Sequence, residues 1–352
     1  MEFSQVEISR MTGMVEGASK VVVLTHTRPD GDAVGSSLAA AAFVRFLNPA
    51  AGVQVVYDTP LPDYLDFLTV GSGCMTAADD PGAAETAIAC ADLLFLTDLS
   101  GLDRLGSLEA AARASSAPRI LVDHHLDPKR EEFACVFSET AISSACELFY
   151  WLLKAVPRMK GSLADLPGKA LTALFTGMTT DTNNFANSVF PSTLGMASQL
   201  LEAGVDRDLI LDKLYHSYRE NRVRAFASLL GSGMVVRPEG YAYMILSAAR
   251  KAAFGLKDGE LEGLVNIPLS MEKVRLSIFL QEDDGFFRVS IRSKKGVSAN
   301  ELAREFFHGG GHVQAAGGRL FMPGDIAGPE AAAGYVESCA PAVLGTIHAN
   351  EK

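Results

Sequence analysis

The sequence predicts an α/β protein with two domains, of which the first is doubly wound around a mainly parallel sheet. In the first half, short apolar runs rich in β-branched residues alternate with longer helical stretches, as in repeated strand–helix–strand units. From residue 232 onward, strand-like runs dominate instead. The 352 residues are also enough for two domains of ordinary size, each with its own core. Together these observations predict a doubly wound domain followed by a smaller α/β domain with a mixed sheet.

The composition narrows the class of protein. Hydrophobic residues make up 48% of the chain and charged residues 21%, which allows a large buried interior. No apolar run approaches the ~18 residues of a membrane span, and the N-terminus lacks the basic flank and apolar stretch of a secretion signal. The net charge of −11 disfavours a long nucleic-acid duplex as the main partner but leaves small phosphorylated substrates open. We therefore expect a cytoplasmic protein with no membrane partner.

The five cysteines are an odd number, widely spaced and without a Cys-x-x-Cys pair. This pattern argues against a disulfide framework and against a thiolate zinc site. We expect buried free thiols in a reducing compartment.

The first domain opens with a helix over residues 4–17, where apolar residues recur at helical spacing. A buried parallel strand over residues 20–26 follows and ends in a loop marked by Pro29 and Gly31. This loop holds His26, Asp30 and Asp32. We expect the next helix to begin at Ser36 or Ser37 and to end before Asn48-Pro49.

The strand–helix pattern then repeats. We expect strands over residues 52–57, 92–98 and 119–123, helices over residues 63–70 and 102–114, and two more helices, one ending near Ala155 and one over residues 169–180. Three strands end in polar residues: His26 with Asp30 and Asp32, then Asp98, then Asp123 with His124 and His125. In doubly wound sheets, ligands bind beyond the carboxyl ends of the strands. The pattern therefore predicts one shared site, to which Asp181 at the end of a helix is a further candidate, although an Asp among Thr and Asn also caps turns.

These side chains suit a divalent metal centre. Carboxylate and imidazole ligands favour manganese or a similar ion, and the absence of cysteine ligands argues against structural zinc. Four carboxylates, those of Asp30, Asp32, Asp98 and Asp181, would balance two divalent cations. Such a centre accepts a phosphate group and lowers the pKa of a water between the metals.

The second half contains a helical stretch over residues 196–225, then strands over 234–237, 241–246, 274–280 and 286–292, the last two joined in a hairpin by Gly285. Two of its features are candidate ligand-binding segments. Arg292, Ser293 and two lysines stand at a strand end, and a glycine loop over residues 309–318 contains His312. Basic strand ends and glycine clusters are also common in ordinary turns, although glycines let the backbone approach a phosphate closely. ATP or NAD binding has no support, because neither nucleotide fingerprint is present.

The segments around His26 to Asp32, Asp98, Asp123 to His125, and Gly177 to Asp181 resemble the four motifs of the DHH phosphoesterase family. That family includes RecJ-type exonucleases, family II pyrophosphatases, cyclic-dinucleotide phosphodiesterases and small oligoribonuclease/pAp phosphatases called nanoRNases. The resemblance implies that His26, Asp30 and Asp98 hold one manganese ion. It implies that Asp32, Asp98, His124 and Asp181 hold the other, so that Asp98 bridges the two. His125 would then face the substrate phosphate as a hydrogen-bond or proton donor, with Asp123 orienting the histidine pair.

The second half resembles the DHH-associated substrate-binding domain. This implies that Arg292, Ser293, Gly310, Gly311 and His312 contact the nucleotide. One departure is His308, which stands where relatives often have another glycine. The expected division is a catalytic metal-binding domain over residues 1–195, a helical linker over 196–225 and a substrate-binding domain over 226–345.

The resemblance implies a manganese-dependent phosphohydrolase that degrades very short oligonucleotides to mononucleotides, with dephosphorylation of pAp to AMP as a further candidate activity. A stand-alone phosphodiesterase for cyclic di-AMP or pApA is the nearest alternative. Lys294 and Lys295 are similar to the basic signature of the pyrophosphatases, but the glycine loop favours the nucleotide-handling branch. A nucleotide-binding regulator without turnover is the alternative from another class. The sequence leaves a homodimer open.

Overall fold

The computed structural model describes residues 3–257 and 259–345. Met1 and Glu2, the first residues of the expected catalytic domain, lie outside the described residues. The chain divides between Ser217 and Tyr218 into two compact units. Among the described residues, no helix combines the length and the apolar character that a membrane span requires.

The first unit is built on a six-stranded parallel sheet with the strand order β3-β2-β1-β4-β5-β6. The strands are β1 (Lys20–Leu24), β2 (Gly52–Tyr57), β3 (Met75–Thr76), β4 (Leu93–Thr97), β5 (Arg119–Asp123) and β6 (Cys135–Ser138). The order reverses between β1 and β4, which makes the carboxyl ends of these two strands the topological switch point. The predicted doubly wound fold is confirmed.

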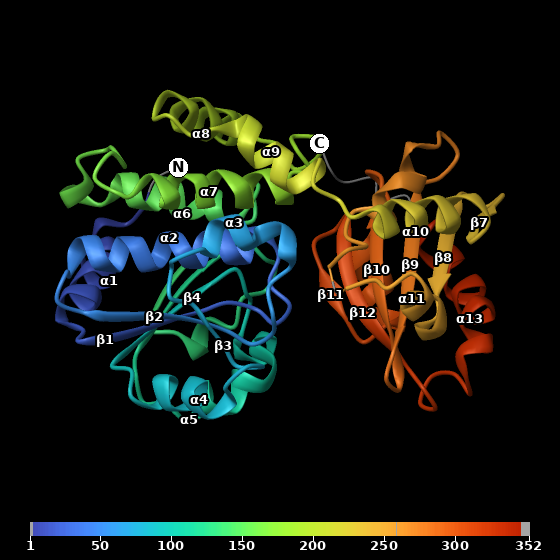
Figure 1. Cartoon of the computed structure of the whole chain (residues 1–352), viewed down its shortest axis with the longest axis horizontal. Helices are drawn as coiled ribbons and strands as arrows, with labels where there is room; N and C mark the ends of the chain where they lie inside the picture. The colour runs from blue at the N-terminus through green and yellow to red at the C-terminus, as the bar shows by residue number, and fades with distance from the viewer. Residues whose placement is uncertain (1–2, 258, 346–352) are drawn as a thin grey trace. The chain divides into compact units, whose positions relative to one another are not determined.

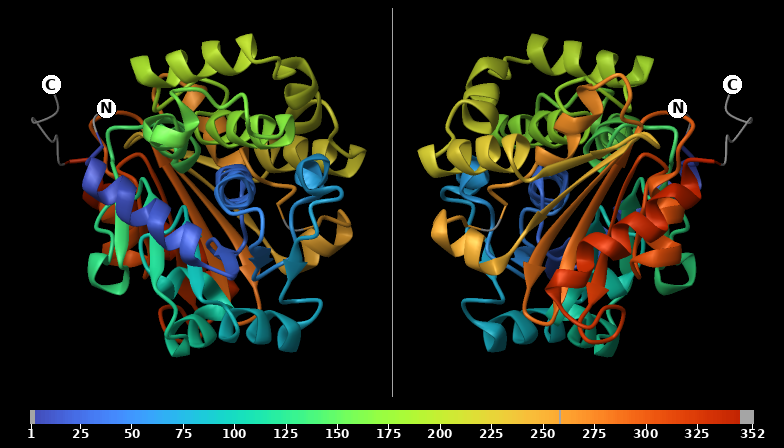
Figure 2. Two further views of the ribbon diagram at one scale, coloured as in Figure 1. Left: turned by 90° about the vertical axis from the view of Figure 1, so that its left-hand side faces the viewer. Right: turned by 90° about the vertical axis from the view of Figure 1, so that its right-hand side faces the viewer.

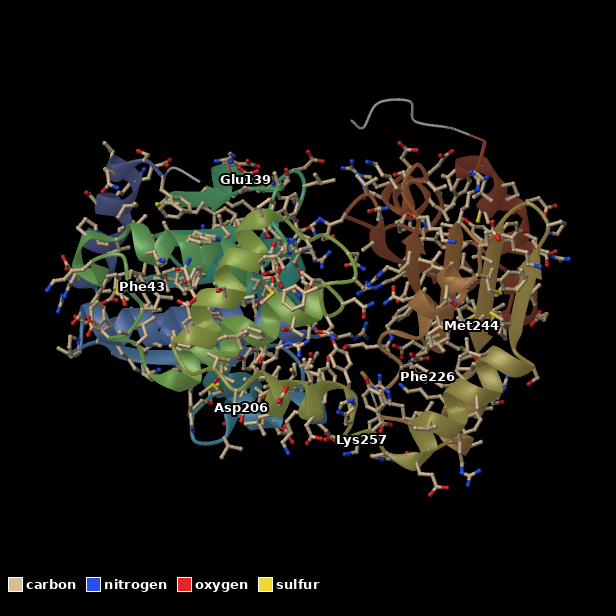
Figure 3. The ribbon with its side chains drawn as sticks, turned by 90° about the horizontal axis from the view of Figure 1, so that it is seen from above. Phe43, Glu139, Asp206, Phe226, Met244 and Lys257 are labelled. Carbon is tan, nitrogen blue, oxygen red and sulfur yellow. The ribbon has the colours of Figure 1, made fainter. Side chains whose placement is uncertain are left out.

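Helices cover both faces of this sheet (Figure 1). One face packs against α1 (Gln5–Gly17), α2 (Gly31–Leu47), α6 (Ala145–Ala155) and α7 (Gly168–Asp181), and the other against α4 (Pro81–Ala89), the 3-10 helix η2 (Leu102–Leu108) and α5 (Glu109–Ala114). Alternate residues of β1 enter the two cores: Val21 and Val23 join the first, whereas Val22 and Leu24 join the second. Burial on both faces explains why the strand is a continuous β-branched run. Phe43, labelled in Figure 3, is fully buried in the first core.

The remaining helices of this unit are shorter or lie farther from the sheet. They are η1 (Asp63–Leu65), α3 (Asp66–Thr69), η3 (Arg130–Glu132), η4 (Pro157–Met159), α8 (Pro191–Glu202) and α9 (Arg207–Tyr215). The left panel of Figure 2 shows α8 and α9 above the layer formed by α2, α6 and α7, on the side away from the sheet.

Several element predictions for the first unit were wrong in detail. Helix α2 begins at Gly31 rather than at Ser36 or Ser37, because the Asp30 carboxylate accepts hydrogen bonds from the N–H groups of Asp32 and Ala33 and caps the helix. The sequence analysis also missed β3, α4 and β6. Two of these are short strands: β3 has two residues and β6 has four. The predicted helix over 102–114 is instead the 3-10 helix η2, interrupted at Gly106 with a φ of +63°, followed by α5.

The second unit has the strand order β11-β12-β10-β9-β8-β7, with β8 and β9 parallel and the other pairs antiparallel. The strands are β7 (Met234–Arg237), β8 (Tyr241–Leu246), β9 (Leu276–Asp283), β10 (Phe286–Ser293), β11 (Gly310–Gly311) and β12 (Ala315–Phe321). The predicted mixed sheet and the hairpin at Gly285, which has a φ of +75°, are confirmed. The glycine run was predicted to be a loop, but part of it pairs as β11 and β12.

Helices also cover both faces of this second sheet, as the right panel of Figure 2 shows. One core lies between the sheet, α10 (Glu220–Gly231) and η5 (Leu264–Ser270), and it includes Met244 and Phe226, labelled in Figure 3. The opposite core lies against α12 (Ala299–Phe306), α13 (Ala332–Cys339) and η7 (Ala340–Val343). Two further short helices are α11 (Ala248–Ala253) and η6 (Pro329–Ala331).

Candidate metal centre

The polar residues at the strand ends come together at the switch point of the first sheet. His26 follows β1, Asp98 follows β4, and His124 follows β5. Two helices add carboxylates, since Asp30 and Asp32 stand at the start of α2 and Asp181 is the last residue of α7. The ligand atoms of two groups lie within 4.8 Å of one another and could each hold a metal ion: His26 with Asp30 and Asp98, and Asp32 with His124 and Asp181. These groups match the two predicted ligand sets, except that the prediction also includes Asp98 in the second set.

Asp98 lies between the two groups. Its Oδ2 is 3.3 Å from Nε2 of His26, and its Oδ1 is 3.5 Å from Nε2 of His124. The backbone of Asp98 adopts a φ of +59°, and its N–H donates to the Val122 carbonyl at the end of the neighbouring strand. This left-handed conformation is uncommon for a residue other than glycine and is found most often where function requires it. Oδ1 is buried and has no hydrogen-bond partner among residues 3–257 and 259–345, as expected for an oxygen whose partner is a cation.

Asp32 is fully buried, and both of its carboxylate oxygens accept hydrogen bonds from the first turn of α6. Oδ2 accepts from the N–H of Ala145 at 2.7 Å, and Oδ1 accepts from the N–H of Cys146 at 2.9 Å. The exposed N–H groups at the start of a helix stabilise a negative charge. This contact fixes the plane of the carboxylate while lone pairs remain for a metal.

His26 is oriented by the ring nitrogen that faces away from Asp98. His26 Nδ1 lies 2.9 Å from the carbonyl of Thr27, so its Nε2 faces Asp98. Thr27 is itself held, because its hydroxyl donates to the buried carboxylate of Asp58. The sequence analysis missed Asp58, although it follows β2 and so carries the same strand-end signal as Asp98. Such outer contacts set the tautomer and direction of metal-binding imidazoles.

His125 differs from His124 in its contacts. Its Nδ1 lies 2.7 Å from Oδ1 of Asp123, which is fully buried at the end of β5. The side chain of His125 is 18% exposed, whereas that of His124 is 5% exposed and lies 3.2 Å from Asp181 Oδ2. His125 is thus placed at the accessible side of the centre, with a buried carboxylate behind it.

The cluster binds protons in place of metals when no metal is bound. Burial lowers the pKa of His26, but its contacts with Asp98 and Asp30 outweigh this and raise it to about 9. Burial also raises the pKa of Asp181 to about 6, although His124 opposes the shift. Burial would likewise raise the pKa of Asp98, but the imidazoles of His124 and His26 close to its carboxylate oxygens hold it well below its usual range.

These pKa values predict a pH-dependent affinity for divalent metal. A metal binds only deprotonated imidazole, so it must displace the proton of His26 at any pH below about 9. Affinity at the His26 position should therefore rise about tenfold per pH unit between pH 6 and 8. Burial lowers the pKa of His124, but its contacts with Asp181 and Asp98 outweigh this and raise it, so affinity at the second position should also rise with pH, and more steeply below about pH 6, where Asp181 binds a proton too. Titration with Mn²⁺ at pH 5.5, 6, 7 and 8 checks this slope. An affinity that does not change with pH would contradict the assignment of His26 as a ligand.

The second unit brings the predicted substrate-binding residues to the region where β10, β11 and β12 pair. Nη1 of Arg292 donates to the Ile291 carbonyl at 2.9 Å, and Oγ of Ser293 donates to the Val297 carbonyl at 2.6 Å. Lys294 uses its ammonium group to hold the Met271 carbonyl at 2.8 Å. Ser293 is buried, and because its hydroxyl proton is donated to Val297, the hydroxyl can only accept a hydrogen bond from a ligand. His312 opens the tight turn between β11 and β12, where its N–H donates to the Ala315 carbonyl.

Gly310 and Gly311 differ in whether the surrounding structure requires a glycine at that position. A Cβ on Gly311, which has a φ of +147°, would lie 2.6 Å from the Ala315 carbonyl oxygen, so packing and conformation both require glycine there. A Cβ on Gly310 would come no closer than 3.5 Å to any atom, an ordinary contact. His308 has a φ of +47°, so this histidine keeps a backbone conformation that favours glycine.

Two family models match the chain. The model described as DHH family, N-terminal domain, matches residues 20–178, and the DHHA1 domain model matches residues 240–327. A solved structure of an exopolyphosphatase-related protein from Bacteroides fragilis is 32% identical with a TM-score of 0.86, covering 97% of this chain and 98% of that one. The doubly wound domain with its carboxylate–histidine cluster, followed by a mixed-sheet unit, defines a two-domain phosphoesterase. The chain belongs to the DHH family of phosphoesterases, with a C-terminal DHHA1 domain.

Two curated relatives have more specific names. The bifunctional oligoribonuclease and PAP phosphatase NrnA of Thermus thermophilus is 28% identical over 322 residues, which cover 89% of this chain and 87% of that protein. The cyclic-di-AMP phosphodiesterase PdeA of Listeria monocytogenes is 25% identical over 320 residues, which cover 87% of this chain but 46% of that protein.

Proposed function

We propose that this protein is a manganese-dependent phosphohydrolase that degrades very short oligonucleotides to mononucleotides and removes the 3′-phosphate of pAp. The observation that carries the proposal is the complete set of six candidate ligands, Asp98 and the five residues around it, in a chain that matches the Thermus NrnA over most of its length. The five free cysteines agree with a cytoplasmic location. The acidic net charge of −11 favours short substrates over long duplexes.

The geometry supports separate tasks for the residues of the centre. His26, Asp30 and Asp98 would hold one divalent cation, and Asp32, Asp98, His124 and Asp181 the other. When bound, such a pair of cations supplies an activated water and neutralises charge on the phosphate oxygens. Asp98, fixed between the two groups by its backbone, would be shared by both positions. The N-terminus of α6 holds the Asp32 carboxylate in one orientation, because the N–H groups of Ala145 and Cys146 donate to its two oxygens.

His125 is the residue best placed to act on the substrate itself. Asp123 accepts a hydrogen bond from Nδ1, so Nε2 is the nitrogen that remains to face a phosphate or leaving-group oxygen. With Nδ1–H donating to Asp123, a neutral imidazole has no proton on Nε2 and can only accept there, so His125 acts as a donor in its imidazolium form, which carries a proton on both nitrogens. We propose that His125 donates a hydrogen bond or proton to the departing oxygen as the phosphorus–oxygen bond breaks.

In the second unit, we propose that Arg292, Ser293, Gly310, Gly311 and His312 contact the nucleotide. Gly310 is the sharpest test of this, because nothing in the protein requires a glycine there. Gly310→Ala should leave the melting temperature unchanged and raise KM for pAp about tenfold, a loss of about 1.4 kcal/mol of binding. Gly311→Ala is the matched variant, and it should lower the melting temperature because its Cβ would lie 2.6 Å from the Ala315 oxygen. An unchanged KM in Gly310→Ala would remove this glycine from the binding surface.

The function is tested with a substrate panel. Purified protein with Mn²⁺ is incubated with labelled oligonucleotides of two to five residues, pAp, pApA and pyrophosphate, beside an Asp98→Ala control. We expect mononucleotides from the shortest oligonucleotides and AMP from pAp, with little hydrolysis of pyrophosphate. Intact dinucleotides and intact pAp would overturn the proposal. Tight nucleotide binding with a metal stoichiometry near zero would favour a regulator without turnover.

A stand-alone phosphodiesterase for cyclic di-AMP or pApA is the second candidate, favoured by the match to the Listeria PdeA. This chain covers less than half of that protein, so the match does not extend to the rest of it. Rates on cyclic di-AMP, pApA and pAp, measured side by side, separate the two functions. The first proposal expects pAp and linear dinucleotides to be hydrolysed faster than the cyclic substrate.

A further inference from the structure

Glu147 is a fully buried carboxylate that the sequence analysis did not single out. It lies in the first turn of α6, and no lysine or arginine pairs with it among the described residues. Its Oε2 instead accepts hydrogen bonds from the N–H and hydroxyl of Ser143 and, at 2.7 Å, from the hydroxyl of Thr193. Its Oε1 accepts a longer bond of 3.3 Å from the indole N–H of Trp151. Burying a carboxylate costs free energy, so these neutral donors, which we call the Glu147 cage, indicate a structural role for Glu147.

The Glu147 cage is connected to Asp32 through the first turn of α6. Ser144 caps α6 by accepting a hydrogen bond from the N–H of Glu147 at 3.0 Å, and Glu147 reaches back to the N–H of Ser143, in the manner of a capping box. The next two N–H groups of the first turn, those of Ala145 and Cys146, are the donors that hold the Asp32 carboxylate. The position of that turn therefore determines the plane of the Asp32 carboxylate.

The same carboxylate also fixes the far end of the loop that follows Asp181. Thr193, in the first turn of α8, accepts from the N–H of Phe190 and donates to Glu147. Between Asp181 and α8 the backbone is strained, since Asn183, Asn184, Phe185 and Ser188 all have positive φ values. Glu147 thus ties together two segments, one that orients Asp32 and one that begins at Asp181. Both aspartates belong to the group that includes His124.

We infer that Glu147 is a positioning residue for the metal position formed by Asp32, His124 and Asp181. The inference rests on the proposed two-metal function. It adds that the two positions depend on different supports, because His26 is oriented through Thr27 and Asp58 and not through α6. Loss of the Glu147 cage should weaken one metal position and leave the other.

The test compares Glu147→Ala, Glu147→Gln and Leu152→Ala, each in the full chain. Leu152 is a fully buried core residue on the same helix and donates none of the hydrogen bonds that Glu147 accepts, so its variant is a matched control for lost stability. Mn²⁺ stoichiometry and affinity are measured by calorimetry on the metal-free proteins, and anomalous diffraction from Mn²⁺ crystals identifies the position that is lost.

We expect Glu147→Ala to bind its second Mn²⁺ ion about 10- to 100-fold more weakly, with the His26 position unchanged. Glu147→Gln should restore two ions, because one amide oxygen can accept the bonds from Ser143 and Thr193. Leu152→Ala should melt at a lower temperature and still bind two ions. Two ions bound with wild-type affinity by Glu147→Ala, or an equal loss in Leu152→Ala, would overturn the inference. These readouts require no substrate, so a wild-type protein inactive on pAp would refute the proposed function without affecting this result.

Discussion

Asp98→Asn is expected to lower kcat/KM on short oligonucleotides and pAp by roughly 10³-fold or more. Replacing a residue that only supports a metal ligand typically costs ~10- to 100-fold, and Asp98 is the one carboxylate placed between both metal groups. Asparagine keeps the shape of the side chain but turns one of the two ligand oxygens into an amide nitrogen, which does not bind a divalent cation. The mutant should also bind Mn²⁺ with reduced stoichiometry, which calorimetry measures beside the kinetics.

Asp92→Asn is a matched control, because Asp92 and Asp98 flank the same strand at opposite ends. The Asp92 carboxylate accepts hydrogen bonds from the N–H groups of Ser19 and Lys20, far from the metal groups. This variant should lose some stability and keep its kcat. Wild-type kcat in Asp98→Asn would contradict the role of Asp98 as the shared ligand.

Gly177→Ala is expected to destabilise the first unit by about 1–3 kcal/mol and to abolish activity at temperatures where the chain is still folded. Gly177 lies where α7 crosses α2, and a Cβ there would overlap Sγ of Cys146 and lie 2.8 Å from Oδ1 of Asp32. Relief of this overlap requires the Asp32 carboxylate to leave the N–H groups of α6. The loss of activity should therefore be larger than the loss of stability alone would cause.

Gly168→Ala provides the comparison for this prediction. Gly168 lies on the same helix, and a Cβ there would meet nothing within 4 Å. Alanine favours the helix over glycine, so this variant should be as stable as the wild type or more so. Thermal unfolding and kcat are measured for both variants. A Gly177→Ala variant with normal kcat would show that the close approach of α2 and α7 is not needed to place Asp32.

The sequence was sufficient for the features that depend on local pattern. Apolar runs ending in Asp or His predicted the strands β1, β4 and β5 and their meeting point, because the carboxyl ends of parallel strands share one edge. The resemblance to a known family supplied the separate roles of His124 and His125, which spacing alone could not distinguish. The structure adds the physical difference, since Asp123 holds only the second of the two.

The supports of the site could not be read from the sequence because they depend on contacts between distant residues. Asp32 is held by N–H groups 113 and 114 residues away, and Thr193 meets Glu147 across 46 residues. The start of α2 was misplaced because Asp30 was interpreted only as a ligand, although it also caps the helix. Gly177 was recognised as part of a motif, but its steric role appears only when α2 and α7 are seen together.

The central claim is that six side chains form two metal positions that share Asp98. Anomalous diffraction from crystals grown with Mn²⁺, recorded above and below the manganese edge, tests it most directly. The predicted result is two peaks, one among His26, Asp30 and Asp98, and one among Asp32, Asp98, His124 and Asp181. A single peak, or two peaks of which only one contacts Asp98, would contradict the account.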